Sequence, residues 1–235
     1  MAAASGVGTY PISIGGAVDS NYSISYVRGM LTVNPAPLTI TGNSATKVLD
    51  APNPALTFTA AGFANGDTAG ALTSVPTCST SATTTSPVGS YAVTCSGGNA
   101  LNYVFSYLPG SLKILYSTAI GHAIQSPIAG DGSSVFKQGR TVPAKFSVYD
   151  ANGLSIGTPG VVSSLHLTGI MSGTGIAPVQ NIVDINNPDS AFRFDATAQN
   201  WIFNISTANL VVGSTYVYTV ALNDGSTIQF RYGLR

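Results

Sequence analysis

The stretch SNYSISYVRGMLTV, residues 20–33, decides the fold because it returns as LNYVFSYLPGSLKI at residues 101–114. The two stretches lie 81 positions apart (101 − 20 = 81), and residues 8–33 align on residues 89–114 without a gap. An ungapped match of this length indicates a duplicated module, and its period suits a small tandem domain better than a solenoid. The identical pairs are Gly8/Gly89, Tyr10/Tyr91, Gly16/Gly97, Asn21/Asn102, Tyr22/Tyr103, Ser25/Ser106, Tyr26/Tyr107, Gly29/Gly110 and Leu31/Leu112.

The repeat divides the chain into modules. One complete module is predicted over residues 35–115, and residues 1–34 are predicted to be the back half of the module before it. We therefore expect Met1 to open a fragment of a longer exported protein. We also expect residues 8–34 to keep a hairpin like that of 89–115, with its apolar side chains less buried than their partners 81 positions on.

Composition predicts a mainly β protein. The nine acidic residues are all Asp, and this lack of the helix former Glu stands beside 26 Gly, 13 Pro and many Thr, Ser, Val and Tyr. Apolar and polar residues alternate in PLTITGNSATKV (37–48), in SYAVTCS (90–96) and in NYVFSY (102–107), as they do in half-buried strands. Residues 63–72 break the alternation and leave room for one short helical turn.

Charge excludes several functions. The net charge is zero, and nine Lys and Arg residues over the whole chain do not supply the basic surface that a nucleic-acid-binding protein needs. No apolar run reaches the roughly 18 residues of a membrane span, and the N-terminus lacks the basic and apolar regions of a signal peptide. Low charge with abundant Thr, Ser, Asn and Gly nevertheless favours a secreted or cell-surface protein.

Several stretches of the complete module resemble the MBG domain, a tandem repeat of large bacterial surface and secreted proteins. They are APLTI, NPALTFT, GF followed by NGD, the two Cys residues, and the closing NY, Y, PG and L in that order. Where the family commonly has Tyr-Gly, this chain has Leu49 and Asp50. The resemblance implies a β-grasp-like fold and a stalk or adhesive role, and it brings no catalytic residues.

The composition changes after Leu115, so residues 116–120 are predicted to be a linker and residues 121–235 a second domain. Alternation recurs around residues 142–148, 201–205, 216–222 and 228–234, and NDG at 223–225 is a strong hairpin pattern. Seven or eight short strands of this kind predict an Ig-like β-sandwich. The segment also resembles the C-terminal PxKF module of bacterial secreted proteins, with Pro143, Lys145 and Phe146 at the name-giving positions.

The two cysteines, Cys78 and Cys95, are predicted to form a disulfide on neighbouring strands or on a strand and its flanking loop. With no further Cys or His nearby, a zinc site is disfavoured. The alternative is a pair of buried free thiols. The position that pairs with Cys95 in the partial repeat is Ile14, so that repeat is expected to lack the bridge.

No pattern points to catalysis or to a cofactor. His122 and His166 stand apart from any nucleophile or acid motif, and the Asp residues lie in turn-like contexts such as NGDT and NDGS. Asp150 and Asn152 with the following Gly make a fragment of an oxygen-rich loop, so calcium stays a secondary possibility although the full EF-hand pattern is missing. We therefore predict a protein that is not an enzyme.

The favoured function is a structural, stalk or adhesive segment of a large bacterial extracellular protein. Its expected partners are neighbouring modules of the same polypeptide and, beyond them, a cell-surface glycan or protein. The alternative is a carbohydrate-binding module in which Trp201 and exposed Tyr residues provide a stacking surface for sugars.

Overall fold

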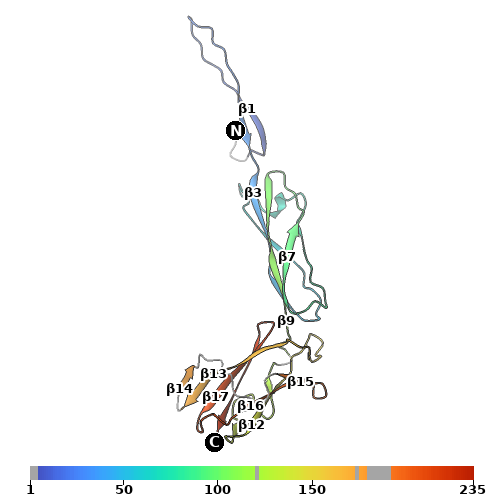
Figure 1. Ribbon diagram of the computed structural model, residues 1–235. Helices are drawn as coiled ribbons and strands as arrows, with labels where there is room; N and C mark the ends of the chain where they lie inside the picture. The colour runs from blue at the N-terminus through green and yellow to red at the C-terminus, as the bar shows by residue number, and fades with distance from the viewer. Residues whose placement is uncertain (1–4, 120–121, 173–174, 179–191) are drawn as a thin grey trace. The chain divides into compact units, whose positions relative to one another are not determined.

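The computed structural model describes residues 5–119, 122–172, 175–178 and 192–235. Over these residues the chain forms strands β1 to β18 and one 3-10 turn, η1 (Ala69–Ala71). Figure 1 draws the strands as arrows along the chain. The predicted fold class, mainly β with several small sheets, is confirmed. Within the described ranges no helix has the length and apolar character needed to cross a membrane.

The chain divides into two compact units. The first comprises residues 1–45, 55–81 and 91–112, and the second comprises residues 46–54, 82–90 and 113–235. This division cuts through the predicted module 35–115, because its residues 46–54, 82–90 and 113–115 belong to the second unit. The domain boundaries at residues 34, 115 and 120 therefore stay a prediction.

The partial repeat forms a two-stranded antiparallel sheet. Strand β1 (Gly8–Ile12) pairs with β2 (Gly29–Val33), with Gly8 opposite Val33 and Ile12 opposite Gly29. Adding 81 places these strands on residues 89–93 and 110–114, which lie in β7 (Gly89–Ser96) and β9 (Gly110–Leu115) and neighbour each other in their own sheet. The predicted hairpin is confirmed.

Its apolar side chains are mostly more exposed than their counterparts. Leu31 is 40% exposed against 0% for Leu112, and Ile12 is 51% exposed against 0% for Val93. Ile14, Ile24 and Val33 follow the same trend against Cys95, Phe105 and Ile114.

The prediction was wrong for two tyrosines. Tyr26 and Tyr107 are exposed alike, at 39% and 38%, and Tyr10 and Tyr91 are both half-buried. The reason for the first pair is a shared local role. The Tyr26 hydroxyl donates to the carbonyl of Ala17 and the Tyr107 hydroxyl donates to that of Gly97, so each ring braces the loop beside it.

The complete repeat contains two sheets. One has the order β5 (Phe58–Ala61), β3 (Ala36–Gly42), β8 (Tyr103–Leu108), with β3 and β8 parallel. The other has the order β4 (Ala45–Val48), β9, β7, β6 (Thr77–Thr80). One hydrophobic cluster of this repeat contains the buried residues Leu38, Ile40, Cys95, Ala100 and Tyr103. The expected short helical turn is η1, and it is the sole helical element described in this repeat.

Two glycines allow strands to approach closely in this repeat. A Cβ atom on Gly110 would lie 2.2 Å from the carbonyl oxygen of Gly42, and one on Gly42 would lie 2.7 Å from that of Val93. A side chain at either position would therefore push the strands apart. Asp50, at the position where the MBG resemblance has Gly, adopts a left-handed φ of 62°.

The described residues from 122 onward form a β-sandwich. One sheet has the order β10 (Ile124–Gln125), β12 (Thr141–Phe146), β16 (Asn200–Ser206), β15 (Arg193–Asp195). The other has the order β11 (Val135–Phe136), β18 (Thr227–Leu234), β17 (Thr215–Leu222), β13 (Val162–Ser172), β14 (Gly175–Pro178). Both sheets contribute to one core, and the strand order is that of an immunoglobulin-like domain.

Candidate functional site

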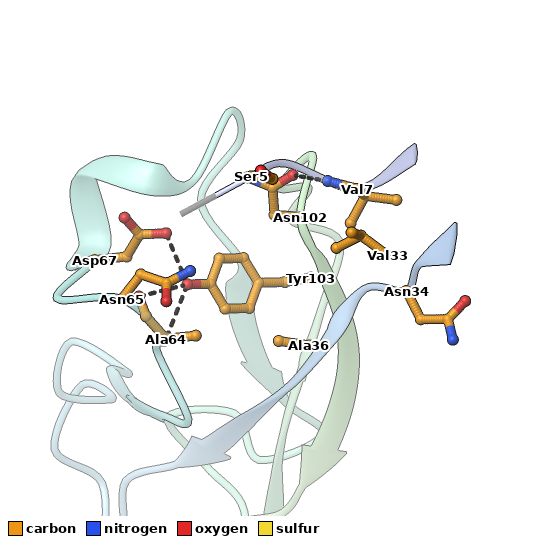
Figure 2. A pocket seen from close by; sticks show the side chains of 10 residues that line it. All are labelled: Ser5, Val7, Val33, Asn34, Ala36, Ala64, Asn65, Asp67, Asn102 and Tyr103. Carbon is orange, nitrogen blue, oxygen red and sulfur yellow. Dashed lines mark hydrogen bonds between the residues drawn. The ribbon is translucent and has the colours of Figure 1, made fainter. Parts of the chain in front are cut away.

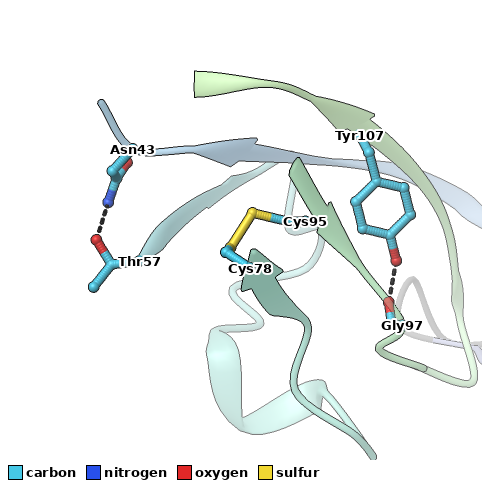
Figure 3. Close-up of a disulfide and its surroundings, with 6 residues drawn as sticks. All are labelled: Asn43, Thr57, Cys78, Cys95, Gly97 and Tyr107. Atoms are coloured by element: carbon cyan, nitrogen blue, oxygen red, sulfur yellow. Dashed lines mark hydrogen bonds between the residues drawn. A yellow bond between two sulfur atoms is a disulfide. The ribbon is translucent and has the colours of Figure 1, made fainter. Parts of the chain in front are cut away.

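The disulfide joins the two predicted cysteines. Cys78 on β6 lies directly opposite Cys95 on β7 in the antiparallel register, and their Cα atoms are 4.0 Å apart. Figure 3 shows the bond between neighbouring strands, near the Tyr107 hydroxyl that donates to the Gly97 carbonyl. Cys95 is 6% exposed and belongs to the hydrophobic cluster of the repeat, so the bond links a core strand to an edge strand.

A small polar cavity of about 180 Å³ lies beside Tyr103, the first residue of β8. The Tyr103 hydroxyl donates to the Asp67 carboxylate at 2.7 Å and accepts from the Ala64 backbone N–H at 2.9 Å. Figure 2 shows the Tyr103 ring pointing at the loop that carries Ala64 and Asp67, with Asn65 beside the hydroxyl. Burial, and then the hydrogen bond to Asp67, raise the pKa of Tyr103.

This arrangement is structural in character. The one carboxylate that lines the cavity is already bound by Tyr103, and the Asn102 side-chain oxygen accepts from the Val7 N–H at 2.9 Å. The cavity is also smaller than the roughly 300 Å³ at which small-molecule sites begin. The sequence alone did not predict the hydrogen bond between Tyr103 and Asp67, because the two residues are 36 positions apart.

The Asp150 loop does not gather calcium ligands. One Asp150 carboxylate oxygen accepts from the backbone N–H groups of Asn152 and Leu154, each at 2.8 Å, so it caps its own turn. Asp150 is 2% exposed. In the parts of the chain that the structure describes, no group of three His, Cys, Asp or Glu side chains is placed to hold a metal ion.

Other aspartates act in the same way, as turn preferences predicted. Asp131, Asp195 and Asp224 each accept backbone N–H groups two or three residues ahead. The hydrogen bond from the Ser133 side chain, and then that from its backbone N–H, lower the pKa of Asp131, and the bonds from the Ala198 and Thr197 N–H groups lower the pKa of Asp195. The second oxygen of Asp224 also accepts from the Tyr116 N–H at 2.8 Å, which fastens the turn to the start of the sandwich.

Trp201 is a core residue. It is 5% exposed on β16, its indole N–H donates to the Ile156 carbonyl at 2.8 Å, and its ring packs edge-on against Phe194. The sequence-based possibility that Trp201 contacts a ligand finds no support in this position, because the ring faces are covered by the sandwich core.

The two histidines lie in different places. His166 is half-buried on β13, opposite Thr219 of β17. His122 packs edge-on against Tyr116, and its two ring nitrogens are buried without a hydrogen-bond partner among the described residues. Burial lowers the pKa of His122, and Asp224 opposes this shift.

A groove of about 370 Å³ runs over strands β13, β17 and β18. The Arg231 side chain donates to the Asp131 carbonyl at 3.3 Å at its rim. The one aromatic residue in its lining, Phe230, is 4% exposed and belongs to the sandwich core. The groove therefore offers polar groups without a ring face on which a sugar could stack. Its lining residues are Gly130, Asp131, Thr168, Gly169, Val217, Gln229, Phe230 and Arg231.

Comparison with protein families finds one similarity. Residues 1–32 and 38–113 match the MBG domain (YGX type), so the N-terminal 113 residues carry MBG-type sequence. The comparison gives no support to a PxKF module in residues 121–235, and that part of the resemblance stays a prediction. No curated protein matches the chain.

The similar solved structures are distant. Domains 4 and 5 of the S-layer protein SbsC are 12% identical, with 78% of this chain and 84% of that chain covered and a TM-score of 0.25. The SbsC structure of domains 4–9 is 14% identical, with 89% and 33% covered and a TM-score of 0.24. SGBP-B of the Bacteroides ovatus mixed-linkage glucan utilization locus, solved with a mixed-linkage heptasaccharide, is 12% identical, with 97% and 47% covered and a TM-score of 0.21. Such low scores carry no argument about function.

Proposed function

We propose that the chain is a non-catalytic structural segment of a bacterial extracellular or cell-surface protein, in which tandem β modules extend or present other parts of the polypeptide. One observation carries this proposal. The MBG match falls on two successive ranges, and the internal repeat aligns residues 8–33 with residues 89–114, near the ends of these ranges. Repetition of a module without a built-in reactive site is typical of spacers and stalks.

The disulfide supports the extracellular location. Disulfides persist in oxidising compartments and are rare in the cytosol, and this one links two strands of a small module whose own core is modest. The low content of charged residues, 8%, points in the same direction. The partners that follow from the proposal are the neighbouring modules of the same polypeptide.

A stalk must resist force, so the test is to stretch the chain by its two ends in a single-molecule instrument. We expect discrete unfolding events under oxidising conditions. Because the disulfide shields the 17 positions that separate Cys78 from Cys95, reduction should lengthen one event by roughly 60 Å at about 3.6 Å per residue. A chain that lengthens smoothly, without force peaks, would contradict a load-bearing role.

The alternative function is that of a carbohydrate-binding module. A glycan array distinguishes this function from that of a stalk. The proposal expects no retained glycan, because Trp201 is in the core and the groove on β13, β17 and β18 lacks an exposed ring. The mixed-linkage heptasaccharide is a suitable added probe. Saturable binding of a glycan that is lost when exposed Tyr22 is replaced by Ala would favour the alternative.

A further inference from the structure

The β1–β2 hairpin exposes an apolar surface, and the equivalent surface of the complete repeat is buried. Leu31 and Ile12 are exposed by 40% and 51%, whereas Leu112 and Val93 at the equivalent positions are fully buried. In the complete repeat Leu38 and Ile40 of β3 share a hydrophobic cluster with Cys95 of β7, whose counterpart in the partial repeat, Ile14, is 61% exposed. The internal repeat thus shows what kind of segment covers such a hairpin.

Gly29 of β2 gives a second indication that such a segment covers the hairpin. Its counterpart Gly110 cannot carry a Cβ, because that atom would lie 2.2 Å from the carbonyl oxygen of Gly42 at the end of β3. The atoms nearest to a Cβ on Gly29 would be those of the Ile12 side chain, at 3.5 Å or more, which is ordinary van der Waals contact. The hairpin therefore keeps a glycine that its own surroundings do not require.

The strand edges agree with these two observations. In the complete repeat β9 is flanked by β4 and β7 is flanked by β6, whereas β1 and β2 pair only with each other in the described residues. Each strand of the hairpin thus has an edge of backbone N–H and C=O groups that another strand can complete.

We propose that the β1–β2 hairpin is the acceptor for a strand-forming segment like residues 36–80, supplied by the same polypeptide on the N-terminal side of the hairpin. This inference rests on the proposed function, since both treat the chain as a row of modules. The segment carries an apolar strand like PLTIT ending in a glycine like Gly42. A cysteine in this segment at the position of Cys78 would have no partner in the hairpin, because Ile14 stands where the complete repeat has Cys95.

The test supplies the segment from the chain itself. Residues 35–85, with Cys78→Val, are fused directly before Ser5 in place of residues 1–4, which restores the 81-position spacing (86 − 5 = 81) of the repeat. Amide hydrogen exchange of residues 8–12 and 29–33 is followed by mass spectrometry. We expect exchange in these strands to slow by about tenfold or more relative to the chain without the added segment.

Two matched variants make the result specific. Gly29→Ala should leave the unfused chain unchanged but abolish the protection in the fusion, because the added methyl group meets the incoming glycine backbone. Leu38→Asp with Ile40→Asp in the added segment should likewise abolish the protection of the hairpin in the fusion, since both side chains are fully buried in the complete repeat. Equal exchange in the fusion and in these variants would overturn the proposal.

A covalent trap gives an independent readout. If Cys78 is kept in the added segment and Ile14→Cys is introduced, a new disulfide should join these two residues under oxidising conditions, as Cys78 joins Cys95. Its absence from non-reduced peptide maps would contradict the register. Protection of the unfused hairpin that grows with protein concentration would also overturn the proposal, since the occupant would then be a second copy. The stretching experiment, run on the whole chain without the added segment, tests the stalk function separately.

Discussion

The side chain of Lys47 is only 7% exposed, and its ammonium group donates to the backbone carbonyls of Ala51, Thr83 and Thr84 at 2.9, 2.6 and 3.2 Å. Lys47→Met keeps the apolar stem but leaves three carbonyl groups without this donor. We expect the free energy of unfolding, measured by urea titration, to fall by about 2–3 kcal/mol. Lys113→Met, at an exposed position of β9, is the control and should change it by less than about 0.5 kcal/mol. Equal effects of the two substitutions would show that the buried carbonyls find other donors.

The burial of His122 should make the free energy of unfolding depend on pH. Burial lowers its pKa in the folded protein below the ordinary value of 6.5, so the unfolded chain takes up a proton first as the pH falls. The stability that the neutral ring contributes is thus fully present above pH 6.5 and is lost as the pH falls toward the lowered pKa. We expect His122→Phe to flatten the decrease in unfolding free energy between about pH 7 and 5, whereas His166→Phe should leave that decrease in place. An unchanged slope in His122→Phe would refute this assignment.

Single-residue roles were predictable where they depend on local sequence. The turn-capping aspartates follow from their neighbours, because an Asp side chain in a turn accepts from backbone N–H groups a few residues ahead. The contacts of Lys47 were not predictable, because two of its carbonyl partners lie 36 and 37 positions away. The place of Trp201 in the core was only partly predictable, since alternation assigns a residue to one face of its strand without saying what covers that face.

At the scale of elements, Tyr216 ties strand β17 to the loop before it. Its hydroxyl accepts from the Val211 N–H at 2.6 Å and donates to the Val211 carbonyl at 3.3 Å, the tyrosine corner of immunoglobulin-like domains. Tyr216→Phe keeps the ring but leaves the Val211 backbone groups unpaired. We expect the unfolding free energy of the sandwich to fall by about 1–2 kcal/mol.

The fluorescence of Trp201 reports this change, since it is the chain's one Trp and lies in the sandwich core. Tyr22→Phe serves as the control, because Tyr22 is 76% exposed. A loss of stability in Tyr216→Phe no larger than in the control would mean that the hydroxyl does not brace the loop.

Long alternating strands were predicted well, and short strands were not. In β17 and β18 every second residue from Tyr216 to Leu222 and from Ile228 to Leu234 is buried, and the NDG turn joins the two antiparallel strands as expected. Strands β10 and β11 have two residues each, too few for any alternation. The parallel pairing of β11 with β18 arises from tertiary packing and left no pattern in the sequence.

At the scale of the whole molecule, the repeat predicted the organisation better than composition did. The 81-position match placed β1 and β2 correctly, because a duplicated module keeps its strand positions even where its surroundings differ. The contacts that group residues 46–54 and 82–90 with the second unit were not predictable from the repeat. Leu49 and Val88, which pack against the sandwich core, come from these two segments.

The central claim is that the chain is a row of separately folding β modules, and the disulfide gives the most direct test of it. Replacing both Cys78 and Cys95 by Ala removes a cross-link of 17 positions, which contributes about 3 kcal/mol in the chain-entropy model. Urea unfolding is followed by amide exchange in β6 and β7 and, in the same samples, by Trp201 fluorescence. The account predicts that the strands of the complete repeat open at lower urea while the Trp201 transition moves by less than about 0.5 kcal/mol. A common shift of both transitions would show one cooperative domain and would contradict the modular account.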